Sequence, residues 1–223
     1  RAESLAKDIN VNLVTKSKSI NPESLFKEGQ NTTHYSIIDN DGNVVSNTYT
    51  LGYSFGSGVT IPGTGILLNN QMNNFAYQYG DPEVIDRSAS IGNRFEPGKR
   101  PMSTMSPIIV FDKNDSIKLI TGSPGGALIP AAILRVVTGV IDFDLNLGEA
   151  SMLPRIHKDW PYENLLLERG FSKDTKNLLK SFGHEIEESK TMGSTQSILI
   201  SSKGVEGFAD LRRPNAGVAI QND

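Results

Sequence analysis

Polar and apolar positions alternate after residue 32 in the manner of β-strands. Residues 35–39 and 44–50 flank Asn40-Asp41-Gly42-Asn43, and Asp-Gly tolerates the positive φ angles that a tight hairpin turn requires. Further short apolar runs bounded by turn residues lie at 65–69, 108–111 and 117–121. The last two are separated by a second polar turn at 112–115. The pattern therefore predicts hairpins in the first half of the chain.

Helical spacing of apolar residues follows in the second half. Residues 126–141 form the strongest predicted helix and 147–153 a second one. Ser172 can cap a third helix over 172–182, which ends before Gly183. Strands are expected again at 163–168, 184–187, 196–201 and 207–210. Hairpins, central helices and further strands indicate antiparallel sheets layered with helices, an α+β sandwich.

Two polar stretches interrupt this pattern. Residues 1–31 combine a short predicted helix at 2–9 with a segment of linker composition at 16–30, and differ from the remainder, 32–223. Residues 77–100 are polar and rich in Gly and Pro. A loop of this length within a compact domain is typically either a functional lid or disordered.

Composition narrows the classes of function. The formal net charge is −3 and Lys and Arg do not cluster, so nucleic acid is not an expected partner. No apolar run approaches the ~20 residues that span a bilayer. The absence of cysteine excludes disulfides, zinc–thiolate sites and a cysteine nucleophile. The chain opens at Arg1 without a signal peptide, and we expect it to be the later part of a longer precursor.

Thr32 is the first candidate for chemistry. If the Asn31–Thr32 bond is broken, the freed α-amine lies beside the Thr32 hydroxyl, and its ordinary pKa near ~8 lets it accept a proton at neutral pH. The same hydroxyl could first attack the Asn31 carbonyl, which gives an ester that water opens. Thr32 could equally be the start of an ordinary strand, because β-branched residues are common there.

Gly125 and Gly126 are the second candidate. Adjacent glycines before an apolar helix let backbone N–H groups approach a ligand, and the helix start adds positive potential, so the pair could form an oxyanion hole. A plain turn is the alternative. His34, His157 and His184 show no metal-ligand spacing, and we interpret them as structural or surface residues; no metal or cofactor is expected.

Several longer motifs stand out: Thr32-Thr33-His34-Tyr35-Ser36, the run from Asp41-Gly42-Asn43 to Thr48-Tyr49-Thr50, residues 65–72, 99–107 and 121–126, and Met192-Gly193-Ser194-Thr195-Gln196-Ser197. Together they resemble the γ-glutamyltransferase family, an N-terminal nucleophile hydrolase family. Residues 32–223 resemble the small, catalytic subunit throughout. Residues 1–31 resemble the C-terminal tail of the large subunit, which ends at the autocleavage bond between Asn31 and Thr32.

The resemblance implies a four-layer αββα sandwich and a set of roles. Thr32 matches the nucleophile, and Thr50 matches the threonine that supports its amine and hydroxyl. Gly125 and Gly126 match the oxyanion-hole pair. Ser103 and Thr104 match a serine pair that holds the substrate α-carboxylate together with a large-subunit arginine.

The activity implied is γ-glutamyl acyl transfer from glutathione or related small molecules to water, an amino acid or a peptide, without a cofactor. The resemblance also implies an autocatalytically cleaved zymogen, a heterodimer with the large subunit of the same precursor, and a periplasmic or extracellular location.

Three positions depart from the family pattern. Gly52 stands where the family usually has an asparagine for the substrate α-amino group, and Asn74 stands where it has an acidic residue for the same ammonium. Gln71 is retained. Ile85 falls at the position of the lid tyrosine that latches onto that asparagine.

These departures leave three interpretations open. Free-amine donors could bind less tightly, with the large subunit compensating, because a charge-assisted hydrogen bond is roughly twice as strong as a neutral one. Alternatively, the donor has no free α-amine, as within poly-γ-glutamate, the substrate of the capsule depolymerase branch. The third interpretation, an inactive homologue that serves as a binding module, is disfavoured by the intact Thr32, Thr50, Gly125 and Gly126.

Overall fold

The computed structural model describes residues 3, 6, 7, 9–14, 16, 32–75, 91–159 and 162–221. Most of the predicted helix at 2–9 and of the linker at 16–30 lies outside these residues. So do Asn31, Ile85 and the greater part of the expected lid. Residues 91–100, the end of that lid segment, are described.

The predicted hairpin is confirmed. β1 (Thr32–Ile38) pairs antiparallel with β2 (Val44–Thr50), and the register places Thr32 opposite Thr50. Gly42 takes a φ of 84° in the turn. The Asp39 carboxylate accepts the N–H groups of Asp41 at 3.0 Å and Asn43 at 2.8 Å, which fixes the turn and the register.

A second sheet has the strand order β3-β4-β8-β9, and all its neighbours are antiparallel. Its members are β3 (Ile108–Phe111), β4 (Ile117–Gly122), β8 (Gln196–Ser201) and β9 (Gly204–Ala209). Each of these strands was expected from the sequence. β9 begins three residues earlier than predicted.

A third, smaller sheet contains β5 (Ile156–Lys158), β6 (Asn164–Leu167) and β7 (Glu185–Glu188). β6 and β7 are parallel, so the expectation of purely antiparallel sheets was wrong here. Their connection carries α4 (Lys173–Ser181), and a helical crossover of this kind joins parallel strands. The three-residue β5 was not predicted, since so short a strand gives almost no pattern.

The strand expected at 65–69 was also wrong. This segment has only an isolated bridge between Thr60 and Leu67. Gly63 and Gly65 take positive φ angles, and Ile66 and Leu68 are exposed. The chain turns back on itself there, so this apolar run does not pair as a strand with a sheet partner. Two short 3-10 helices follow, η2 (Gln71–Asn74) and η3 (Ile91–Asn93).

The three predicted helices are confirmed. A 3-10 turn, η4 (Gly126–Leu128), leads into α2 (Ile129–Ile141). α3 (Leu147–Met152) begins with a capping box between Asn146 and Glu149. Ser172 caps α4 by accepting the N–H of Thr175 at 3.0 Å.

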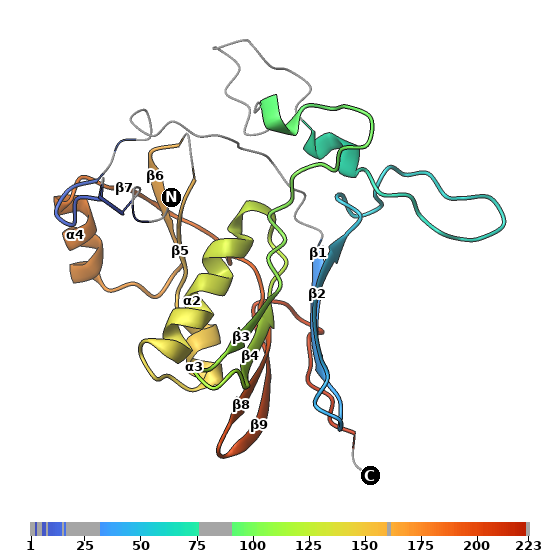
Figure 1. The fold of residues 1–223 in the computed structure, drawn as a ribbon. Coiled ribbons are helices and arrows are strands. Elements are labelled where there is room, and N and C mark those ends of the chain that lie inside the picture. The colour runs from blue at the N-terminus through green and yellow to red at the C-terminus, as the bar shows by residue number, and fades with distance from the viewer. Residues whose placement is uncertain are drawn as a thin grey trace.

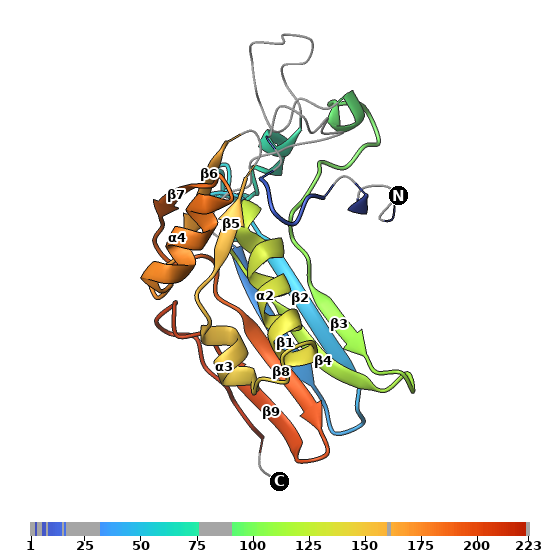
Figure 2. The same ribbon diagram turned by 90° about the vertical axis from the view of Figure 1, so that its left-hand side faces the viewer.

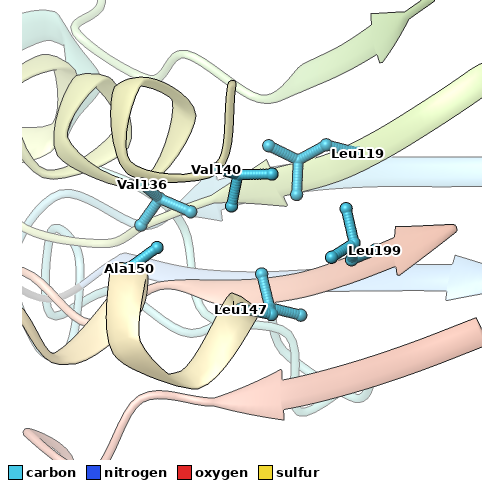
Figure 3. Packing of buried hydrophobic residues seen from close by; sticks show 6 residues of the cluster. All are labelled: Leu119, Val136, Val140, Leu147, Ala150 and Leu199. Atoms are coloured by element: carbon cyan, nitrogen blue, oxygen red, sulfur yellow. The ribbon is translucent and has the colours of Figure 1, made fainter. Parts of the chain in front are cut away.

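Helices α2 and α3 cover one face of the β3-β4-β8-β9 sheet, and the β1–β2 hairpin lies on the other side (Figures 1 and 2). The buried core between helices and sheet consists of Leu119, Val136, Val140, Leu147, Ala150 and Leu199 (Figure 3). The α+β class is therefore confirmed, as a helix–sheet–sheet stack. The described residues supply three of the four expected layers; no helix among them covers the outer face of β1–β2.

Membrane insertion by a helix finds no support in the described part of the chain, where no helix combines the length and the apolar character needed to cross a bilayer.

Candidate active site

The inward face of the β1–β2 hairpin is polar. Even-numbered residues of both strands point toward the second sheet, while odd-numbered residues are mostly exposed. Two hydroxyls bridge the sheets: Ser36 Oγ donates to the Gln196 carbonyl at 2.9 Å, and Ser46 Oγ donates to the Thr121 carbonyl at 3.1 Å. These bonds fix the hairpin against β4 and β8.

His34 joins the start of β1 to the end of β4. A Cβ at Gly122 would lie 2.1 Å from the His34 ring, so the absence of a side chain there makes room for the imidazole. The ring is buried and bonds Thr48 Oγ1 through Nδ1 at 2.7 Å. Burial lowers its pKa to about 4, so it is neutral at pH 7. The structural role expected for His34 fits this placement.

Thr32 lies at the beginning of this polar face. The residue is 2% exposed, and its hydroxyl has no hydrogen-bond partner among the described residues. Buried hydroxyls are usually paired, so an unpaired one marks a position reserved for another group. A cavity of about 360 Å³ adjoins it; we call this the Thr32 cavity. It is lined by Thr32, Thr33, Tyr49, Thr50, Leu51, Tyr53, Ser54 and Arg213.

Thr50 stands opposite Thr32 and connects to the next segment. Its Oγ1 accepts the N–H of Gly52 at 2.9 Å, and its carbonyl lies 3.5 Å from Gln71 Nε2. The structure therefore brings Thr32, Thr50, Gly52 and Gln71 together at one end of the hairpin.

Gly52 is required by its surroundings. Its φ is +92°, and an added Cβ would lie 1.9 Å from Asn70 Oδ1, which accepts the N–H of Tyr53 at 3.0 Å. An asparagine at position 52 would have to displace Asn70.

Asn74 belongs to a series of hydrogen-bonded neutral amides that begins at Gln71. It is 5% exposed, and its Nδ2 donates to Gln71 Oε1 at 2.6 Å. The backbone carbonyl of Asn74 accepts a hydrogen bond from Asn93 Nδ2 at 2.6 Å. Asn93 Oδ1 in turn accepts the N–H of Met102 at 3.0 Å. This amide chain links residues 50–75 with residues 91–102.

The Gly125–Gly126 turn has a backbone that favours glycine at both positions. The φ angles are 141° and 59°, and a Cβ at Gly125 would lie 3.1 Å from the Gly193 Cα. Thr104 Oγ1 donates to the Gly126 carbonyl at 2.9 Å. The Ser103 hydroxyl accepts the N–H of Met105 at 3.1 Å. The structure thus brings Thr104 against the turn.

A second cavity adjoins the start of β1 and the residue before the turn. Pro124, which precedes the turn, lines it together with Thr33, His34 and Arg213. Gly122, at the end of β4, packs under His34, two residues from Thr32. The predicted nucleophile and the predicted oxyanion turn therefore lie at the same end of the two facing sheets.

Sequence reasoning missed a buried ion cluster behind this end of the molecule. It consists of Arg155, Glu168, Asp210 and Arg212. Burial raises the pKa of Asp210, but Arg155 and the N–H groups of Arg212 and Thr195 outweigh this and hold the pKa below its ordinary value. The four charges come from three separate segments of the chain, and the local signal was Asp210 followed closely by Arg212 and Arg213.

A buried threonine that opens an inner strand, with two facing sheets and helices outside one of them, defines the class of the N-terminal nucleophile hydrolases. The model of the gamma-glutamyltranspeptidase family matches residues 1–220. The chain belongs to that family.

Similarity to individual proteins supports this family assignment. The chain is 44% identical over 213 residues to the glutathione hydrolase proenzyme of Escherichia coli, covering 95% of this chain and 37% of that protein. The T380A mutant of Helicobacter pylori gamma-glutamyltranspeptidase superposes with a TM-score of 0.74 at 39% identity, over 81% of this chain and all of that one. The transpeptidase CapD of Bacillus anthracis gives 0.63 at 26%, over 85% and 99%. The chain thus spans little more than a third of the E. coli relative's length.

Proposed function

We propose that this chain carries the catalytic part of a γ-glutamyl-transferring enzyme, with Thr32 as its nucleophile. The observation that carries the proposal is the buried Thr32 hydroxyl, unpaired among the described residues and beside a cavity. Relatives named glutathione hydrolase proenzyme support a γ-glutamyl donor such as glutathione.

Maturation comes first in this proposal. The Thr32 hydroxyl attacks the Asn31 carbonyl, the peptide nitrogen becomes the free α-amine of Thr32, and an ester joins the two residues. Water then opens the ester and restores the hydroxyl. One residue thereby gains both a nucleophile and an adjacent base. Residues 1–31 end the large subunit, and residues 32–223 form the small one.

Catalysis uses the same hydroxyl. The α-amine takes the hydroxyl proton while Oγ attacks the γ-carbonyl carbon of the donor. The N–H groups of Gly125 and Gly126 stabilise the negative oxygen that develops. The amine of the leaving group then departs with a proton from the α-ammonium, and a γ-glutamyl ester remains on Thr32.

The second half of the reaction reverses these roles. The α-amine accepts a proton from water or from an acceptor amine as that group attacks the ester carbon. It then returns the proton to Thr32 Oγ as the ester bond breaks. Thr50 holds the nucleophile from the facing strand, and Thr104, bonded to the Gly126 carbonyl, holds the donor carboxylate with Ser103. Every group in this sequence belongs to the protein or to a substrate, so the proposal includes no cofactor.

The partner in this proposal is the large subunit of the same precursor. The exposed outer face of β1–β2 supports it, because that face carries Tyr35, Ile37, Val45 and Tyr49. Apolar patches of this kind mark interaction sites. A helix layer of the large subunit there would complete the fourth layer of the sandwich. We place the enzyme in the periplasm or outside the cell, from the family resemblance.

The test uses the full-length precursor. Purified protein should split without added protease and give a chain whose mass begins at Thr32. Thr32→Ala should abolish both the splitting and the release of aniline from a γ-glutamyl anilide, while Thr33→Ala, which alters the exposed neighbour, should split and turn over. Cleavage after Asn31 in the Thr32→Ala variant would overturn the proposal.

A second candidate is transfer from poly-γ-glutamate. The amide chain of Gln71 and Asn74 favours it, because a neutral site does not require the free α-ammonium that internal residues of this polymer lack. The structural likeness to CapD is compatible with it, but the glutathione hydrolases are more similar to this chain.

A further inference from the structure

Two consecutive arginines, Arg212 and Arg213, follow β9, and their side chains contact different parts of the molecule. Arg212 points into the buried ion cluster, where Nη2 lies 2.7 Å from Glu168 Oε2. Arg213 points toward β1, where its Nη1 donates to the Thr32 carbonyl at 3.0 Å. The predicted nucleophile is therefore in direct contact with a guanidinium 181 residues further along the chain.

The ion cluster fixes the turn that presents Arg213. Arg155 Nη2 lies 2.5 Å from Asp210 Oδ2, and Arg212 Nη1 lies 3.2 Å from Asp210 Oδ1. The Asp210 carboxylate also accepts the N–H of Arg212 at 2.9 Å. All four side chains of the cluster are at most 7% exposed. The backbone of 210–213 is thus anchored, and the direction in which Arg213 leaves it is set by buried contacts.

Arg213 also brings a positive charge to the Thr32 cavity. It is the one charged side chain among the described residues that line the Thr32 cavity, and the other titratable groups there are the phenols of Tyr49 and Tyr53. The cavity beside Pro124 adds Tyr35 and His34, which burial keeps neutral at pH 7.

None of the described residues that line these two cavities is acidic. β4 and β8 contribute Gln196 to the lining of these two cavities; Lys118, the charged residue of β4, lines a different cavity at the other end of that strand. The ion cluster behind the turn holds two positive and two negative groups, which compensate one another.

We infer that Arg213 is a positioning residue that keeps the freed α-amine of Thr32 in its neutral, proton-accepting form and fixes the Thr32 backbone. The inference rests on the proposed role of Thr32. A positive charge disfavours protonation of a nearby amine, so the base becomes available at lower pH. The contact to the carbonyl oxygen also limits rotation of the residue that must aim the hydroxyl.

Backbone geometry limits the separation involved. The nitrogen and the carbonyl oxygen of one residue are less than about 4 Å apart, so Nη1 lies within about 7 Å of the Thr32 nitrogen. Arg213 is exposed in this chain, and solvent weakens its effect. We therefore expect Arg213 to lower the pKa of the amine by about half to one unit.

The test compares Arg213→Gln with Arg213→Lys in the cleaved full-length enzyme. The readout is the acidic limb of kcat/KM against pH at low salt, with a γ-glutamyl anilide as substrate. Arg213→Gln should move that limb upward by about half to one pH unit, and Arg213→Lys should keep it close to the wild-type position. At alkaline pH the rate of Arg213→Gln should recover toward the wild type. High salt should narrow the difference.

Lys203→Gln is the matched control, since it removes one positive charge from the exposed β8–β9 turn. An unshifted limb in cleaved Arg213→Gln would overturn the inference, as would an equal shift in Lys203→Gln. If Arg213→Gln does not split by itself, an enterokinase sequence placed directly before Thr32 releases the amine for the same measurement. Failure of the proposed function would look different, because wild type would then be inactive or Thr32→Ala active.

Discussion

At the scale of single residues, hydrogen bonds hold the polar side chains between the two sheets. Among these side chains, the protonation of His34 can be followed through the pH dependence of stability. Its pKa falls from 6.5 to about 4 on folding, because burial disfavours the imidazolium. Between these values the unfolded chain binds a proton that the folded protein excludes. The stability contributed by neutral His34 is therefore complete above pH 6.5 and is lost as the pH falls toward 4.

This linkage predicts the pH dependence of unfolding. As the pH is lowered from about 6.5 to 4.5, the free energy of unfolding should fall with a His34 contribution approaching about 1.4 kcal/mol per pH unit. His34→Gln, which removes the titrating group, should lack this part of the slope, whereas Thr33→Ala on the exposed side of β1 should keep it. The measurement is urea unfolding of the cleaved enzyme at several pH values. Equal slopes for wild type and His34→Gln would contradict the assignment.

Asn74 is the residue that best tests substrate choice. A γ-glutamyl anilide and its N-acetylated counterpart differ at the α-nitrogen alone, and a neutral Asn74 should discriminate weakly between them. Asn74→Asp should sharpen the preference for the free amine by at most a few kcal/mol in kcat/KM. The Gln71 amide must rotate to donate to the new carboxylate, which gives up only the 3.5 Å contact with the Thr50 carbonyl.

The control for Asn74→Asp is a charge placed next to it on the protein surface. Asn73→Asp places the same charge on the exposed neighbour, and it should leave the selectivity unchanged. If the unmodified enzyme already rejects the acetylated substrate as strongly as Asn74→Asp does, another group reads the ammonium, and the neutral amide at 74 does not explain substrate choice.

At the scale of elements, the sequence correctly predicted the features that depend on neighbouring residues, such as turns and helix caps. The hairpin turn at Gly42 and the cap at Ser172 follow from short-range rules and are confirmed. The strand expected at 65–69 was wrong because a short apolar run does not reveal whether a partner strand is present. The parallel pair β6–β7 was missed because the orientation of two strands depends on the path of the chain between them.

The glycine turn before α2 combines local and distant constraints. Its φ angles require glycine, which sequence could suggest, but the contact with Gly193 comes from the segment before β8. Ser123 Oγ accepts the N–H of Ser194 at 2.9 Å and holds that segment in place. The orientation of the N–H groups of Gly125 and Gly126 therefore depends on two segments rather than on one turn.

Substitution in this turn should impair turnover more than stability. Gly125→Ala forces a Cβ to within 3.1 Å of the Gly193 Cα at a φ of +141°, so the turn must move. Losing one oxyanion donor typically costs about 100- to 1,000-fold in turnover, and we expect a loss in kcat of that order. Gly63→Ala, at a φ of +76° with open space around it, is the control for backbone strain alone. Near-normal kcat in folded, cleaved Gly125→Ala would place the oxyanion site elsewhere.

At the scale of the whole molecule, the least predictable features are those assembled from distant segments. Arg155, Glu168 and the pair Asp210–Arg212 come from three separate segments of the chain, and no spacing rule joins these segments. A role for Thr32 as nucleophile, by contrast, could be proposed from the sequence because Thr32 lies in a motif that resembles the family. What the sequence did not reveal is that the hairpin is polar inside and apolar outside, the reverse of an ordinary surface hairpin.

That reversed pattern yields a prediction about assembly. Ile37 and Val45 face each other across β1 and β2, and they are 50% and 46% exposed in this chain. If a layer of the large subunit covers them, a charge there must be buried on association. Ile37→Lys should therefore weaken the heterodimer by about 1.5 to 3 kcal/mol, the scale of one buried aliphatic side chain. Val205→Lys alters a comparably exposed residue, 56% accessible, on β9 of the other sheet.

Size-exclusion chromatography of the cleaved enzyme in graded urea measures this directly. The two subunits of Ile37→Lys should separate at a lower urea concentration than those of the wild type, while Val205→Lys should separate with the wild type. The hairpin itself should remain folded in both variants, because the inward bonds of Ser36 and Ser46 are untouched. Subunits of Ile37→Lys that separate at the wild-type midpoint would show that the apolar face of β1–β2 is not where the large subunit docks.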